Sequence, residues 1–237
     1  MLSKEECLAY DRLVKKYQSH IYPLIFFNTI NDLKFNVNDK LEVLELGTGN
    51  GYLSNQFIKN TNFQVDSIDI NEEMIFITEN NFPENTVNYM IDDAHYLKKI
   101  GDESKDLIIS YSCFHHWEYP VNVIKACLKK LNKKGVIVFF DTRPLNSEEC
   151  RILQSTINEE NQRALLLKAS QEAWNIEKVE KALLNNFEHL HFNLNYFEPT
   201  AIDVASSIDE LDTMNKWKEI ELSPTLWRLV IKKGELK

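Results

Sequence analysis

Two adjacent histidines stand near the middle of the chain, in the stretch CFHHWEY at residues 113–119. Neighbouring imidazoles can bind a metal, act as acids or bases, or pack in a core. A metal site needs further His, Cys or carboxylate ligands at suitable spacing, and the other histidines show no such pattern with His115 and His116. We therefore expect no metal site here, and base chemistry and packing stay open as alternatives.

A glycine-rich loop, Gly47-Thr48-Gly49-Asn50-Gly51, follows the apolar run LEVLEL. The chain has only six glycines, so three in one loop point to a special backbone. Glycine lets the chain turn sharply and approach a ligand closely. The free N–H groups of the helix that we expect to start near Asn50 suit an anion. The spacing G-x-G-x-G differs from the G-x-G-x-x-G of dinucleotide-binding proteins.

Acidic residues follow three successive predicted strands around this loop. Glu45 precedes the first glycine, Asp69 ends the second strand, and Asp92-Asp93-Ala94 ends the third. Asp69 can accept two hydrogen bonds from a ribose diol, and Asp93 can accept one from an adenine amino group. Asp92 competes for the latter role. Three acids suit a nucleoside with a cationic side chain better than a pyrophosphate.

The elements that must position these residues follow from hydrophobic patterning. Strands alternate with helices between residues 41 and 141, which predicts a parallel, doubly wound α/β sheet. Carboxyl ends of such strands form the ligand crevice. Strands are expected at 41–46, 63–70, 86–91, 106–111 and 135–141, with helices at about 50–59, 72–81 and 120–131.

Outside this core the chain is predicted to be mainly helical, with two late strands. Residues 3–34 have helical spacing, and Pro23 is expected to divide them into two helices. One or two helices are expected at 146–172, a helix at 177–186, strands at 187–196 and 226–232, and helical or irregular chain at 199–217. The predicted parts are an N-terminal cap (1–36), a core (37–145), a helical insert (146–175) and a C-terminal part (176–237) with a cap segment at 197–220.

Four stretches, ELGTGNG, DIN, DDA and DLIISYSCFHHW, together resemble the class I S-adenosylmethionine-dependent methyltransferases across about residues 40–142. The stretch at Phe114–Trp117 is most similar to the small-molecule, type 11 branch. The resemblance implies a seven-stranded doubly wound, Rossmann-like methyltransferase sheet that ends in an antiparallel hairpin and carries a helical cap. It also implies S-adenosyl-L-methionine as cofactor and S-adenosyl-L-homocysteine as product.

The resemblance also assigns roles by position. Glu45 would hold the methionine ammonium, Asp69 the ribose hydroxyls, and Asp93 or Asp92 the adenine amino group. The remaining cofactor contacts would come from Gly47, Thr48, Gly49 and Gly51 around the methionine carboxylate, from Ile70 and Ala94 at the adenine, and from Ser112 at the methionine end.

Strands four and five are expected to be neighbours, so His115 and Asp141 can meet at one edge of the sheet. An Asp–His pair is the arrangement of a general base. His116 is the alternative base, and helix capping or packing against the cofactor is the non-catalytic reading of both. The candidate substrate-binding residues are Tyr17, Tyr22, Trp117 and Arg143. Core packing for Trp117 and a surface salt bridge for Arg143 stay open.

Composition narrows the function classes. A net charge of −9 disfavours nucleic acid and anionic membranes as partners. Four scattered cysteines indicate reduced thiols, and we expect a cytoplasmic monomer or homodimer. The expected function is methyl transfer to nitrogen or oxygen of a small molecule. Alternatives are a peptide or protein methyltransferase, a non-catalytic cofactor-binding protein of this fold, and an NAD(P)-dependent oxidoreductase.

Overall fold

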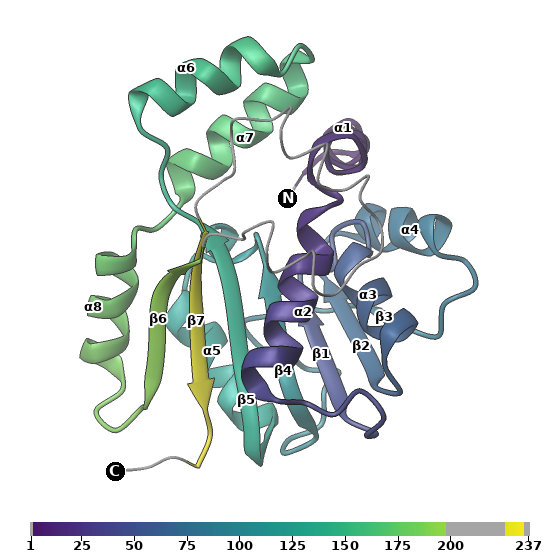
Figure 1. The fold of residues 1–237 in the computed structure, drawn as a ribbon, viewed down its shortest axis with the longest axis vertical. Coiled ribbons are helices and arrows are strands. Elements are labelled where there is room, and N and C mark those ends of the chain that lie inside the picture. Colours follow the sequence, from purple (N-terminus) through teal and green to yellow (C-terminus); the bar gives the residue numbers. More distant parts are fainter. Residues whose placement is uncertain (1, 198–225, 235–237) are drawn as a thin grey trace.

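A seven-stranded sheet forms the centre of the computed structural model, which describes residues 2–197 and 226–234 (Figure 1). Its strand order is β3-β2-β1-β4-β5-β7-β6, and β7 runs antiparallel to both of its neighbours. The expected Rossmann-like sheet with its C-terminal hairpin is therefore confirmed. The strands are β1 (Glu42–Leu46), β2 (Gln64–Asp69), β3 (Asn88–Ile91), β4 (Lys105–Tyr111), β5 (Leu131–Thr142), β6 (Phe192–Phe197) and β7 (Leu226–Lys232).

Helices cover both faces of the sheet because successive strand residues point to opposite sides. Val43 faces the core beneath α2 and α3, whereas Leu44 faces the core beneath α5 and α8. The long helices are α1 (Lys4–Leu13), α2 (Ile21–Leu33), α3 (Tyr52–Asn60), α4 (Glu72–Asn81), α5 (Pro120–Lys130), α6 (Ser147–Thr156), α7 (Glu160–Glu172) and α8 (Ile176–Asn186). A π-helical turn, η1 (Val14–Gln18), and a 3₁₀ turn, η2 (Phe114–His116), complete the set.

Three helices stand beyond the carboxyl ends of the parallel strands, at the top of Figure 1. The N-terminal α1 contacts α4 and α7, and α6 packs beside α7. Arg12 of α1 pairs with Glu159 just before α7 at 2.7 Å. These helices together cover the edge of the sheet at which the parallel strands end.

Several expected boundaries were wrong, among them the start of β5, which begins at Leu131 rather than at 135. Pro23 does not separate the N-terminal helices, because it is the third residue of α2, where its missing N–H needs no partner. The division lies earlier, at Ser19 and His20. The sixth strand begins at Phe192 rather than 187, since α8 extends to Asn186 and Phe187 is its C-cap. The cap segment expected at 197–220 lies, except for Phe197, outside the described residues.

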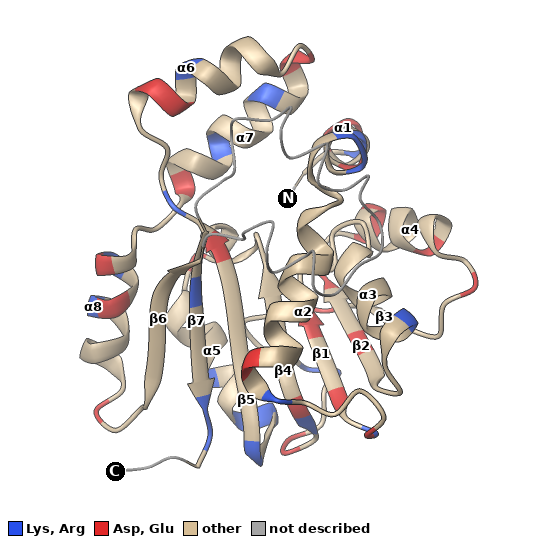
Figure 2. Ribbon diagram, viewed as in Figure 1, with Lys and Arg blue, Asp and Glu red and all other residues tan. Residues whose placement is uncertain are grey.

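Charged residues of both signs are interspersed over the helices (Figure 2). Among the described residues, no helix has the length and apolar character needed to cross a bilayer.

Candidate functional site

The glycine loop turns the chain from β1 into α3 with left-handed backbone at all three glycines. Their φ angles are +72° at Gly47, +54° at Gly49 and +84° at Gly51. A Cβ at Gly51 would lie 2.6 Å from Thr78 Cγ2, and one at Gly47 would lie 2.4 Å from Cys113 Sγ. Both conformation and space therefore require glycine at these two positions.

Asp69, at the end of β2, fixes this loop. One carboxylate oxygen accepts a hydrogen bond from the Gly49 amide at 3.1 Å, and the other accepts one from the Asn71 amide at 2.9 Å. Burial raises the pKa of Asp69, although these backbone donors oppose the effect. A carboxylate has about four acceptor sites, so Asp69 keeps capacity for further donors.

Glu45 lies buried beside the loop, with 3% of its surface exposed. The parallel register places it opposite Ser67, whose hydroxyl donates to Glu45 Oε2 at 2.6 Å. Thr48 Oγ1 lies 3.4 Å from the same oxygen. Burial raises the pKa of Glu45 to about 7, against the effect of these hydroxyls. A buried carboxylate of this kind is stabilised by a cation.

Asp92 and Asp93, which follow β3, form hydrogen bonds with nearby residues of the same loop. Asp92 accepts hydrogen bonds from the Asp93 and Lys99 amides, both at 2.8 Å, so both of its oxygens bind the local backbone. Asp93 uses Oδ1 to bind the His95 amide and ring. Asp92 thus holds the loop with both of its carboxylate oxygens, whereas Asp93 uses only Oδ1 in these contacts. Ile70, which follows Asp69, leaves 52% of its surface exposed.

His115 and Asp141 meet as expected, because β4 and β5 are adjacent and in register to their ends. Asp141 is fully buried; its Oδ1 lies 2.7 Å from His115 Nδ1, and its Oδ2 accepts the His115 amide at 3.0 Å. Burial lowers the pKa of His115, but the charge and hydrogen bond of Asp141 outweigh it and the net shift is upward. The outer nitrogen, Nε2, is buried and has no hydrogen-bond partner among the residues that the structure describes.

His116 points toward the cap. Its ring centroid lies 4.0 Å from that of His115, and its Nδ1 lies 3.0 Å from Glu172 Oε2 of α7. Burial and the nearby charge of His115 lower the pKa of His116, while Glu172 acts in the opposite direction. The two histidines therefore connect the end of β5 to the cap helix.

Four tyrosines gather between the glycine loop and the N-terminal helices. Tyr10 of α1 covers the loop, with a ring carbon 3.3 Å from the place of a Cβ on Gly49. Tyr22 packs between Tyr52 and Tyr111, at centroid distances of 5.4 and 5.3 Å. Sequence reasoning missed Tyr10 as a site residue, because its position depends on how α1 docks.

Three of the four candidate substrate contacts are used inside the protein. Tyr22 is 5% exposed within the tyrosine group, so it is a packing residue. Trp117 is 7% exposed and packs on Phe139 at 5.2 Å, in the core beneath α5. Arg143 forms a two-pronged ion pair with Glu149 of α6.

The fourth candidate, Tyr17, lines a cavity of about 110 Å³ beyond the ends of β4 and β5. Its walls come from the N-terminal helices, the two strand ends and the cap helices α6 and α7. Ser112, the expected contact for the methionine end, lines the same cavity. It has a left-handed backbone (φ +55°) and donates its amide to the Phe140 carbonyl at 2.9 Å. Ser112 therefore lies between the cavity and the carboxyl ends of the parallel strands.

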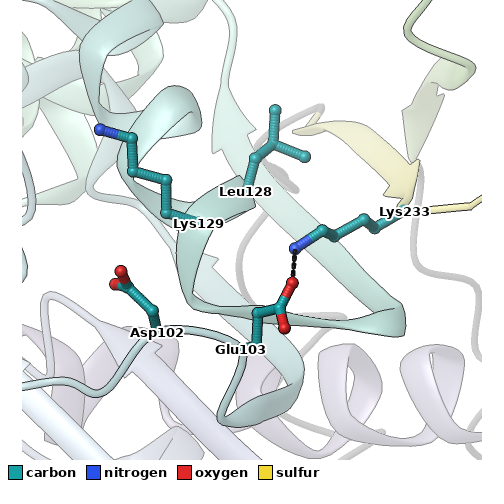
Figure 3. Close-up of a pocket in the computed structure, with 5 residues that line it drawn as sticks. All are labelled: Asp102, Glu103, Leu128, Lys129 and Lys233. Carbon is teal, nitrogen blue, oxygen red and sulfur yellow. Dashed lines mark ion pairs between the residues drawn. The ribbon is translucent and has the colours of Figure 1, made fainter.

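A larger hollow of about 500 Å³ is lined by charged side chains at the opposite edge of the sheet (Figure 3). Glu103 and Lys233 form an ion pair of 3.9 Å across it. It is remote from the glycine loop and carries none of the predicted site residues. Among the described residues, no group of three or more His, Cys, Asp or Glu side chains could hold a metal ion.

The central part of the chain matches a known protein family. Residues 44–139 match the family described as "Methyltransferase domain". This part of the chain is therefore similar to the methyltransferase domains of that family. The chain is 30% identical over 114 residues to an uncharacterized methyltransferase of Schizosaccharomyces pombe. That alignment covers 48% of this chain, and the chain spans 43% of the length of that relative.

Solved structures of methyltransferases share the fold. The plantazolicin methyltransferase BamL, in complex with a triazolic desmethylPZN analog and SAH, has a TM-score of 0.73 at 16% identity, covering 96% of this chain and 90% of that one. Phosphoethanolamine N-methyltransferase 2 of Haemonchus contortus, in complex with S-adenosyl-L-methionine, has a TM-score of 0.64 at 13% identity, covering 98% and 57%. At these identities the likeness establishes the architecture alone.

The raised pKa of Glu45 makes stability depend on pH. An unfolded Glu ionises near 4.5 and the folded one near 7, so between these values the folded state holds the extra proton. The free energy of unfolding therefore falls as pH rises through this window. Between about pH 5.5 and about pH 8, wild type should lose on the order of 2 kcal/mol relative to Glu45→Gln. Urea unfolding of both proteins at each pH measures this difference, and parallel pH profiles would contradict it.

Proposed function

We propose that the chain is an S-adenosylmethionine-dependent methyltransferase that acts on a nitrogen or oxygen atom of a small molecule and leaves S-adenosylhomocysteine. The proposal rests on one arrangement. A glycine loop with left-handed backbone, a buried acid beside it and an acid on the next strand end lie together at the carboxyl edge of a parallel sheet. Ligands of open α/β sheets bind at this edge.

The residues present fit such a cofactor. Glu45, buried with its pKa raised to about 7, suits an ammonium group, whose charge would favour the ionised carboxylate. Asp69 retains acceptor sites for a ribose diol, and the half-exposed Ile70 offers an apolar surface for a base. Asp93 is proposed to accept from the adenine amino group, with Ala94 donating its amide, and Ser112 to lie at the methionine end.

The cofactor supplies a methyl group on a positive sulfonium, and methyl transfer breaks the S–CH₃ bond as the acceptor atom bonds to the carbon. The protein must align the acceptor, exclude water and take the proton that the acceptor releases. The cavity beside Ser112 is proposed to hold the acceptor, with α6, α7 and the N-terminal helices as its cover. A cavity enclosed in this way favours a small acceptor over an extended peptide.

We assign the base to His115. Its Nδ1 donates to Asp141, so in the neutral ring Nε2 carries the lone pair. Nε2 is buried and finds no partner in the described part of the chain, an arrangement that costs free energy and is often tied to function. Asp141 makes the ring more basic, while a positive sulfonium nearby would lower the pKa of His115 and keep the ring neutral before transfer. His116, bound to Glu172, is proposed to position the cap over His115.

Cofactor binding is tested by calorimetric titration with S-adenosylhomocysteine and, in parallel, with NADH. Wild type should bind S-adenosylhomocysteine and give no heat with NADH. Asp69→Asn should weaken binding by at least about tenfold, because it removes charge-assisted hydrogen bonds. Asp102→Asn, an exposed acid paired with Lys130 far from the loop, serves as the matched control and should leave affinity unchanged.

Binding of NADH alone would replace the proposal by an oxidoreductase. Equal affinity in the two Asp variants would remove Asp69 from the site.

The base assignment is tested by NMR titration of the histidine side chains. In the S-adenosylmethionine complex the pKa of His115 should be lower than in the S-adenosylhomocysteine complex, because the two ligands differ by the sulfonium charge. The control is the exposed His189, whose ring signals should be the same in both complexes at each pH. Asp141→Asn should lower the pKa of His115 in the free protein. An unchanged His115 pKa between the two complexes would place it away from the transferred methyl group.

A further inference from the structure

The cavity beside Ser112 has two chemically different ends. Hydroxyls of Ser112 and Thr142 stand at the ends of β4 and β5, next to the proposed methionine end of the cofactor. The cap side combines the aliphatic Leu153, Ile157 and Leu166 with the polar Glu149, Thr156 and Ser170. A molecule in this cavity would therefore place a polar group toward the sheet and an apolar body beneath the cap.

Charge at the wall is already neutralised. Among the described lining residues, Glu149 is the one Asp, Glu, Lys or Arg side chain. Its carboxylate binds both terminal nitrogens of Arg143 and accepts the Asn146 amide at 2.8 Å, as part of the capping box of α6. Arg143 in turn lowers the pKa of Glu149, which keeps the pair ionised. A cation would have to displace Arg143 from Glu149. An anion would meet no Lys or Arg among the described lining residues, and His20, which also lines the cavity, is already engaged. Burial of either ion is therefore costly.

The size of the cavity limits what it can bury. Its volume is about 110 Å³. An aliphatic cavity of roughly 150 Å³ in another protein takes up benzene and stays dry without it. The enclosed part of the acceptor is therefore about the size of one ring or a short branched chain.

We propose that this cavity selects an uncharged acceptor with a single-ring-sized apolar body, whose nucleophilic oxygen or nitrogen faces Ser112 and Thr142. This inference rests on the proposed function and adds the class of acceptor to it. Arg143 determines specificity indirectly, because it neutralises Glu149, the one acid among the described lining residues. Ala169 of α7, which also lines the cavity, sets the room beneath the cap.

Three isosteric probes test the charge preference in the full chain saturated with S-adenosylhomocysteine. They are 4-(trifluoromethyl)benzyl alcohol, the corresponding benzylamine and the corresponding benzoate, which are neutral, cationic and anionic near neutral pH. Fluorine NMR relaxation reports binding of each. The alcohol should bind on the order of tenfold more tightly than either ion. Equal or tighter binding of an ion, or no binding of the alcohol, would overturn the inference.

A pair of variants on one helix tests the location. Ala169→Leu should fill the cavity and weaken binding of the alcohol by about tenfold or more. Ala164→Leu, on the exposed face of α7, should leave it unchanged. Both variants should keep wild-type affinity for S-adenosylhomocysteine, which verifies folding. If wild type does not bind S-adenosylhomocysteine, the proposed function is refuted. If wild type binds S-adenosylhomocysteine but Ala169→Leu leaves the affinity for the alcohol unchanged, only the cavity assignment is refuted.

Discussion

The hydrogen bond from the Gly49 amide to the Asp69 carboxylate ties the end of β1 to the end of β2, and the site is built around that tie. It holds the loop in a conformation that only glycine adopts readily. Gly47 and Thr48 amides donate to the Ile68 carbonyl, so the whole turn is bound to the neighbouring strand. Because strands are parallel, this one edge also receives the ends of β4 and β5, with His115 and Asp141.

Buried acids at this edge make the site favourable for a cation. Glu45 and Asp141 are almost or fully inaccessible, and burying a carboxylate is costly unless it is paired or hydrogen-bonded. Asp141 accepts hydrogen bonds from the His115 amide and ring. Glu45 is hydrogen-bonded by hydroxyl groups among the described residues, and its pKa rises to about 7. Such an acid is unfavourable for the empty protein and favourable for a cation beside it. A cation bound beside Glu45 would therefore stabilise the ionised carboxylate.

Sequence patterning could predict the core because its rules are local. Strand alternation, the glycine spacing and the acids at strand ends placed β1, β2 and β4, and α4 was expected at its observed residues, 72–81. The meeting of His115 with Asp141 also followed, since neighbouring parallel strands end together.

Contacts that depend on tertiary docking could not be predicted. Tyr10 reaches Gly49 only because α1 folds across the strand ends, and His116 reaches Glu172 across 56 residues of chain. Trp117 and Tyr22 have side chains that suit a pocket as well as a core, and the structure places both in packed, buried positions. Arg143 found its partner in the capping box of α6 instead of at the surface.

The central claim is that three strand ends form one nucleoside-binding surface, and a crystal structure of the chain with S-adenosylhomocysteine tests it most directly. The account predicts ribose oxygens within hydrogen-bonding distance of Asp69, the adenine on Ile70 with its amino group at Asp93, and the ammonium near Glu45. It also predicts that the sulfur points toward Ser112 and the cavity. A nucleoside bound elsewhere, or a sulfur directed away from that cavity, would contradict it.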